Sequence, residues 1–161
     1  MAKGNTRLAQ QRSIEIEKHE SGSGPQPPWT WFCFVDRRGK DVIDAWHAGL
    51  SVVARANFSR ARDHLSQLRF ELWSKPHPAS SIGHHIYVIR FKDESSKQWR
   101  VFGHSVASRR AFVMSFIATE KDNVYIPSDS AARAKKHQGI VASDFAKSTC
   151  PCFPKLKTAG N

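Results

Sequence analysis

Two arginines, a histidine and a lysine lie within or beside strand-like apolar runs of the sequence: Arg90, Arg100, His104 and Lys121. Charged side chains are costly in such runs unless their head groups reach solvent or a partner, so their positions suggest a chemical role. Cleaving RNA without a metal needs a base for the 2′-OH proton, an acid for the leaving 5′-oxygen, and positive charge over the phosphate. The planar fork of arginine holds two phosphate oxygens at once, which suits Arg90 and Arg100 to the last task.

His104 is the candidate base or acid, because histidine titrates near neutral pH. It shares a strand face with Arg100 and lies about 13 Å further along the strand, so both side chains can line one groove. Lys121 can add charge over the phosphate or, with a lowered pKa, donate the proton. Simpler explanations stay open. The arginines can lie on a solvated sheet face or pair with acids from elsewhere, and His104 can be a surface histidine without a role.

Further cations and one tyrosine are candidates for RNA contact. Arg55, Arg62 and Arg69 are spaced by seven residues, which predicts an exposed basic stripe on a helix. A solvated helix face produces the same pattern. Tyr125 can stack on a base, although a half-buried packing role is the common alternative. Arg133 lies on a short basic helix that we expect after the last strand.

The elements that position these residues are three strands at 84–91, 98–105 and 111–117. Each run is rich in β-branched and aromatic residues and is bounded by polar turn residues, which predicts an antiparallel meander. Side-chain alternation places the arginines and His104 on hydrophobic strands, and we expect them on an uncovered face of the sheet.

An apolar strand at 29–35, a helix capped by Asp41 and a longer helix starting at Ser51 precede the meander. A small basic helix from Ser128 to His137, ended by Gly139, follows it. This order predicts an α+β fold: a small twisted antiparallel sheet with helices on one face and the other face open.

Composition divides the chain into three parts: a flexible N-terminal extension at 1–28, one domain at 29–138 and a loosely ordered C-terminal tail at 139–161. Lys and Arg outnumber Asp and Glu by 25 to 14, a formal charge of +11, which favours a polyanionic partner. Neither a signal peptide nor a membrane-spanning segment is visible, so we expect a cytoplasmic protein with no membrane partner.

The three cysteines of the chain are Cys33, Cys150 and Cys152. They form no disulfide framework of the kind found in secreted proteins, which favours a reducing compartment. The Cys-Pro-Cys pair is a poor metal site without a second pair of ligands, so neither a metal nor a cofactor is expected.

Five sequence pieces in order, FVDRRGKDVIDAW, IYVIRF, WRVFG, FVMSFIATEKDN and IPSDSAARA, resemble the RelE/HigB superfamily of type II toxins, in its phage-derived HigB-like branch. The likeness covers roughly residues 31–137. It implies a RelE-like fold and a ribosome-associated endoribonuclease that cuts mRNA and is inhibited by a cognate helix-turn-helix antitoxin. Arg90 and Arg100 match basic strand residues of the family. Glu120-Lys121 stands where the family usually shows two lysines.

Two other functions fit the same sequence. A non-catalytic module of this fold would bind RNA or antitoxin without cutting, and Glu120 in place of a lysine favours that interpretation. A toxin of the related ParE branch would act by binding a topoisomerase. Growth arrest with mRNA fragmentation, arrest with an SOS response, and no arrest separate the three functions.

Overall fold

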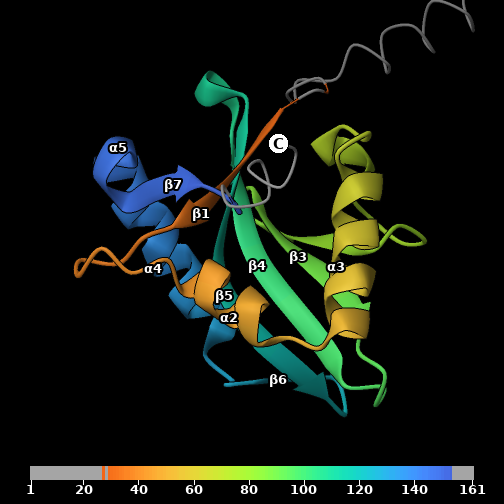
Figure 1. Ribbon diagram of the computed structural model, residues 1–161. Helices are drawn as coiled ribbons and strands as arrows, with labels where there is room; N and C mark the ends of the chain where they lie inside the picture. The colour runs from red at the N-terminus through yellow and green to blue at the C-terminus, as the bar shows by residue number, and fades with distance from the viewer. Residues whose placement is uncertain (1–26, 28, 154–161) are drawn as a thin grey trace, which may run out of the picture.

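The computed structural model describes residue 27 and residues 29–153 (Figure 1). The elements in chain order are β1 (Thr30–Phe34), α2 (Val42–Gly49), α3 (Val52–Leu65), the 3-10 helix η1 (Phe70–Leu72), β2 (Ala79–Gly83), β3 (Ile86–Lys92), β4 (Gln98–Val106), the 3-10 helix η2 (Ala107–Arg109), β5 (Ala111–Lys121), β6 (Val124–Ile126), α4 (Ser130–Ser143), α5 (Phe145–Ser148) and β7 (Thr149–Pro151). Among the described residues, no helix is both long enough and apolar enough to cross a membrane.

The strands form one mixed sheet in the order β2-β3-β4-β5-β1-β7, with β6 paired to β5 beyond the end of β1. The predicted meander is confirmed as β3, β4 and β5, and the α+β class is confirmed. The expectation of a purely antiparallel sheet is wrong, because β1 runs parallel to β5, with Thr30 opposite Ala111. A parallel pair needs a long connection between its strands, which the helices and the meander supply here.

Local capping signals correctly predicted where α2 and α3 begin. The Asp41 carboxylate accepts a hydrogen bond from the Asp44 amide at 2.9 Å, and the Ser51 hydroxyl accepts one from the Ala54 amide at 3.1 Å. The helix that starts at Ser51 is shorter than the arginine pattern predicts, because α3 ends at Leu65, before Arg69. The separate 3-10 helix η1 follows it.

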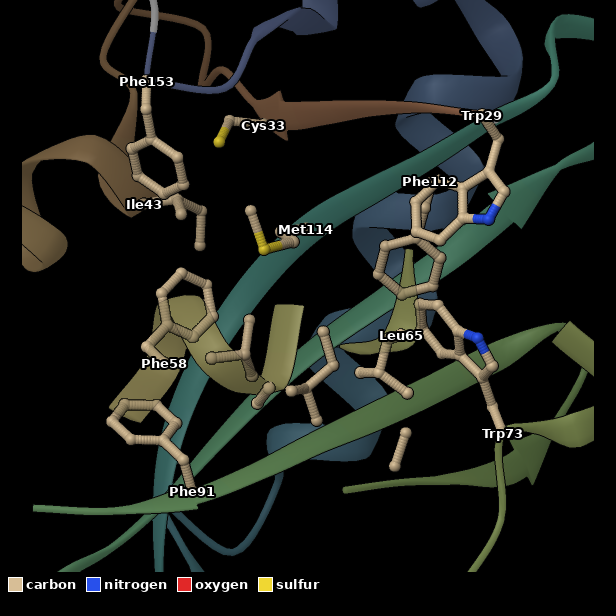
Figure 2. Packing of buried hydrophobic residues seen from close by; sticks show 14 of the residues in the cluster. Trp29, Cys33, Ile43, Phe58, Leu65, Trp73, Phe91, Phe112, Met114 and Phe153 are labelled. Carbon is tan, nitrogen blue, oxygen red and sulfur yellow. The ribbon is translucent and has the colours of Figure 1, made fainter. Parts of the chain in front are cut away.

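The α2–α3 layer packs on one face of the sheet and encloses the main hydrophobic core (Figure 2). Trp29, Trp73 and Phe112 meet there with ring centroids 4.8 to 6.0 Å apart. Phe58 and Phe91 pack at 5.5 Å. Large aromatic side chains each bury about 150–250 Å², so this cluster dominates the apolar burial.

The opposite face of the sheet is covered by α4 over β4 and β5, which corrects the expectation of a wholly open face (Figure 1). Ala134 and Val141 of α4 are buried against this face. The prediction that the helix ends at Gly139 is wrong, because α4 continues to Ser143. A glycine inside a helix costs about 1 kcal/mol relative to alanine, and packing of α4 on the sheet outweighs that cost.

The chain after Gly139 is ordered as far as Phe153, which corrects the prediction of a loose tail for that part. β7 pairs antiparallel with the edge of β1, and a disulfide joins Cys33 to Cys152. This link contradicts the expectation that the cysteines form no disulfide. The remaining tail and nearly all of the predicted extension at 1–28 lie outside the described residues.

Candidate functional site

Two arginines, a glutamate and a tyrosine meet on the α4 side of the sheet: Arg90, Arg100, Glu120 and Tyr125. We call them the Arg–Glu cluster. Arg90 lies opposite Arg100 across β3 and β4, and Glu120 lies opposite Tyr125 across β5 and β6. The tyrosine ring meets Phe102 edge to face, with centroids 5.0 Å apart. The sequence-based expectation that the two arginines share one face is confirmed.

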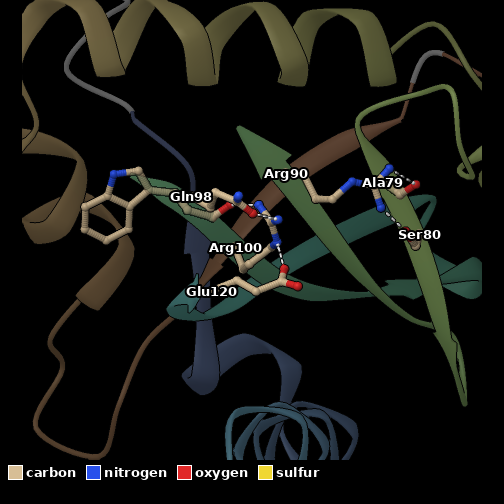
Figure 3. A network of polar contacts seen from close by, with 7 residues as sticks. Ala79, Ser80, Arg90, Gln98, Arg100 and Glu120 are labelled. Carbon is tan, nitrogen blue, oxygen red and sulfur yellow. Dashed lines mark hydrogen bonds and ion pairs between the residues drawn. The ribbon is translucent and has the colours of Figure 1, made fainter. Parts of the chain in front are cut away.

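Arg100 is held by partners on all three guanidinium nitrogens (Figure 3). Nε donates to the Glu120 carboxylate, one Nη donates to the Trp99 carbonyl at 2.9 Å, and the other donates to the Gln98 side-chain oxygen at 2.7 Å. Only 7% of Arg100 is exposed. The expectation that Arg100 carries an unpaired charge ready to bind a phosphate is therefore wrong in this structure, because the Glu120 carboxylate neutralises that charge.

Arg90 is half-buried and reaches toward the edge strand β2 (Figure 3). Its guanidinium donates to the Ser80 hydroxyl and to the carbonyls of His77 (2.8 Å) and Ala79 (3.2 Å). Burial, followed by the nearby Arg100 charge, lowers the pKa of Arg90. No acid forms an ion pair with Arg90 among the described residues, so the positive charge of Arg90 is not neutralised and the cluster is positively charged overall.

The Tyr125 phenol is half-buried beside Glu120. Burial and then the glutamate charge raise the pKa of Tyr125, while the two arginines act in the opposite direction. The phenol is thus protonated at neutral pH and has a proton to donate.

His104 lines a hollow of about 610 Å³ between the end of β4, α4 and α5, but its side chain is almost wholly buried, so the expected exposed position is wrong. His104 is 2% exposed beneath α4, and within the described part of the chain neither ring nitrogen has a hydrogen-bond partner. Burial, ahead of the neighbouring His137, lowers the pKa of His104 to about 4. The imidazole is therefore neutral at pH 7, and it does not face the Arg–Glu cluster openly as a catalytic histidine would.

The predicted arginine stripe is not an exposed surface. Arg55, Arg62 and Arg69 are each partly buried, and Arg69 lies beyond the end of α3. The Arg62 guanidinium stacks over Phe153 at 5.0 Å, and burial lowers the pKa of Arg62. Arg62 thus packs against the core, and the three arginines do not form one exposed row.

Lys121 and Arg133 are exposed, as expected. Alternation along β5 directs Lys121 to the side opposite Glu120, so it does not join the cluster. Arg133 of α4 pairs with Asp129 at 2.9 Å and lies 5.6 Å above the Phe116 ring. Arg133 is thus close to the aromatic residues that border the cluster.

Glu120 is the functional residue that sequence reasoning left outside the site. The sequence could have indicated its position, because antiparallel pairing of residues 98–106 with residues 111–120 places Glu120 opposite Gln98. Arg100 then lies two residues further along the same strand face. The obstacle was register: a bulge between Phe102 and Gly103 shifts the pairing within the hairpin.

Comparisons with protein-family models, curated proteins and solved structures found no match for this chain. The class that the fold defines is therefore general: an α+β protein with a mixed sheet between two unequal helical layers. Among the described residues, no group of three or more histidine, cysteine, aspartate or glutamate side chains is placed to hold a metal ion.

Proposed function

We propose that the protein is the toxin of a type II toxin–antitoxin system with RelE/HigB-like character, a ribosome-dependent endoribonuclease that cleaves mRNA in the cytoplasm. Its inhibitor would be a cognate helix-turn-helix antitoxin. The observation that supports this proposal is the Arg–Glu cluster, which gathers two guanidinium groups, a carboxylate and a protonated phenol on strands that resemble those of the family.

In this proposal Glu120 replaces His104 as the general base. Its carboxylate takes the proton of the 2′-OH, and the oxygen attacks the adjacent phosphorus. Arg90 and Arg100 hold the phosphate oxygens as charge builds on them. The Tyr125 phenol, which is protonated at neutral pH, gives its proton to the leaving 5′-oxygen.

The pairing of Arg100 with Glu120 is the resting state in this mechanism. A scissile phosphate that binds Arg100 offers its Nε and Nη donors new acceptors, and the glutamate is then released toward the 2′-OH. The cost of breaking the ion pair is offset only when the phosphate is placed correctly. Free RNA is therefore a poorer substrate than mRNA positioned on the ribosome.

A second function, binding RNA or antitoxin without cleavage, is favoured by one specific observation. Every nitrogen of the Arg100 guanidinium already has an internal partner. If the ion pair never opens, the cluster is a structural network, and the basic surface alone carries the function.

Induction in cells separates these functions. We expect the wild type to stop growth and to produce new transcript 5′ ends. Glu120→Gln is expected to lose cleavage by about 100-fold or more, because general acid–base catalysis contributes about 10²–10⁴. Arg90→Ala is expected to lose cleavage as well, and Arg60→Ala, which removes an exposed charge on α3, serves as the matched control.

Each outcome of the induction experiment has one meaning. Cleavage by Glu120→Gln at the wild-type rate would refute the catalytic assignment. Arrest with an SOS response and intact transcripts would identify a ParE-like topoisomerase poison. Normal growth with antitoxin binding retained would identify the non-catalytic module. Thermal unfolding of each purified variant shows whether a loss reflects chemistry or folding.

The cytoplasmic location has its own check in the state of Cys33 and Cys152. Disulfides are rare in the cytoplasm because cellular thiols reduce them. Alkylation of thiols in freshly broken cells should therefore trap both residues at least partly reduced. A fully oxidised pair would contradict the proposed location.

A further inference from the structure

A second cationic site lies on the β1 side of α4, away from the Arg–Glu cluster. It is a hollow of about 590 Å³ between the turn after β1, α4 and α5, which we call the α4–α5 hollow. A volume of this size is typical of ligand sites. Three exposed cations line it: Arg37 of the turn, Lys136 of α4 and Lys147 of α5.

The charges of the α4–α5 hollow are unbalanced in favour of an anion. Within the described residues, none of the three cations forms an ion pair. Two acids, Asp36 and Asp144, also line the hollow and leave it a net charge of +1, but their carboxylates are held by backbone amides. Asp36 accepts from the Arg38 and Lys40 amides at 2.8 and 3.0 Å, and Asp144 accepts from the Lys147 amide at 3.1 Å.

The hollow is built from ordered elements rather than from loose surface side chains. Its floor is the buried Phe34 ring, which stacks on His137 at 4.1 Å, and His137 is fixed in turn by a 2.8 Å hydrogen bond to the Ser115 carbonyl. α5 is held in place by β7 and by the disulfide of Cys152. The lysine on α5 therefore has a fixed backbone position opposite α4.

One face of α4 connects the hollow with the Arg–Glu cluster. Residues 133, 136, 137, 140 and 144 recur at three- and four-residue steps and so lie along one side of the helix. Arg133 begins this row above Phe116, next to the aromatic border of the cluster. Lys136 follows one turn later at the hollow. From Arg133 to Asp144 the row extends about 17 Å.

We propose that the α4–α5 hollow binds a backbone phosphate of a single-stranded RNA that runs along α4 from the Arg–Glu cluster. This inference rests on the proposed function. Arg133 and Lys136 lie one turn apart on this face, and Lys136 also lines the hollow together with its other two cations. Cationic side chains thus lead from the cluster to the hollow, as binding of a negatively charged strand requires. The hollow holds the strand in register, so that the scissile phosphate reaches Arg90 and Arg100.

The experiment measures affinity for an RNA that cannot be cut. The probe is a fluorescent, fully 2′-O-methylated RNA of mixed sequence, about twelve nucleotides long, within the range of known single-strand sites. Its affinity for the full-length wild type is compared with that for the double variant Lys136→Gln/Lys147→Gln. The control Arg60→Gln/Lys97→Gln removes the same charge from exposed positions on the α2–α3 side.

We expect the hollow variant to bind the probe about tenfold more weakly at 0.1 M salt, with a salt slope shallower by about 0.7, since the hollow holds one phosphate and each phosphate contact on a single strand contributes about 0.7. The control should change affinity less than twofold, because neither residue lines the hollow or belongs to the Arg–Glu cluster. Both lysines are exposed, so both variants should unfold at the wild-type temperature.

Three results would overturn the inference. The first is that the two double variants weaken probe binding equally, and the second is that the wild type shows no measurable binding of the probe. The third is that the hollow variant binds the probe normally while it no longer binds the antitoxin. The last would show that the hollow receives an acidic protein segment. Failure of the proposed function is a different result. In that case the wild type binds the probe through the hollow but leaves unmodified mRNA intact on ribosomes.

Discussion

Removing the charge of Glu120 should destabilise the protein, because it leaves the Arg100 guanidinium buried without an acid. Breaking a buried pair by removing one partner costs about 3–5 kcal/mol. The Glu120 side chain is 20% exposed and the Arg100 side chain 9%, which favours the lower end of that range. Arg90 lies directly opposite Arg100, and like charges in that position add a further penalty of about 0.2–1 kcal/mol. We therefore expect Glu120→Gln to cost about 3 kcal/mol.

The expected cost can be read as a melting temperature. Unfolding entropy is about 2.1 cal/mol/K per residue, so for roughly 125 ordered residues a loss of 3 kcal/mol lowers Tm by about 10 °C. Urea denaturation gives the free energy directly. Glu94→Gln is the matched control, since Glu94 is exposed and accepts only a hydrogen bond from Ser51 among the contacts of the described residues, and it should cost less than about 0.5 kcal/mol.

A double-mutant cycle isolates the pair from the rest of the site. Arg100→Met combined with Glu120→Gln removes both charges, so the double variant should be more stable than the sum of the single losses implies, by about 2 kcal/mol. Additive losses, or a Glu120→Gln variant as stable as Glu94→Gln, would refute the conclusion that an internal acid neutralises Arg100.

Three further predictions concern the packing around the site. Cys152→Ser opens a link that spans 119 residues of sequence and should cost up to about 5 kcal/mol; equal urea midpoints for oxidised and reduced wild type would argue against it. Since burial lowers the pKa of His104 from 6.5 to about 4, the unfolded chain binds the extra proton in that pH range, so stability should fall as pH drops from 6.5 to 4, by about 3 kcal/mol in all. His104→Leu should flatten this dependence of stability on pH. Parallel dependences for the wild type and the variant would contradict the lowered pKa of His104. Gly103→Ala should cost about 1–3 kcal/mol or more, because its Cβ would lie 2.4 Å from a Phe112 ring carbon; an unchanged Tm would contradict the packing.

Elements with a strong local signal were predictable from the sequence. Asp41 and Ser51 mark helix starts through side chains that cap the next turn, and the three apolar runs of the meander alternate as strands do. β2 carries no such signal. Its sequence, ASSIG, is small and polar, and it is a strand because it pairs with β3.

Tertiary packing decides the features that sequence reasoning missed. Glycine commonly follows the last turn of a helix, which is why the sequence predicts a helix end at Gly139. α4 continues through Gly139 because Val141, in the next turn, is buried on the sheet. The same helix encloses His104. No pattern within residues 98–106 tells whether a later helix will cover that histidine, so its accessibility could not be predicted.

The candidate site was predictable in its arginines and not in their partners. Alternation alone places Arg90 and Arg100 on hydrophobic strands, and the hairpin brings them opposite one another. Pairing with an acid depends on the bulge at Gly103, which sets where Glu120 falls along β4. The position of a bulge depends on packing between side chains of different strands, and here the Phe112 ring lies close against Gly103 of the neighbouring strand.

The position of β1 between β5 and β7 has a consequence for synthesis. β1 precedes the other strands of the described residues, yet its neighbours are encoded about 80 and 115 residues later, so both of its edges stay unpaired until those residues have been made. A nascent chain therefore carries an unpaired, aromatic strand for most of its elongation, which exposes it to chaperones and to aggregation. Complete folding is delayed until residue 151 has left the ribosome. A polypeptide that stops earlier lacks β7, the strand that pairs with one edge of β1.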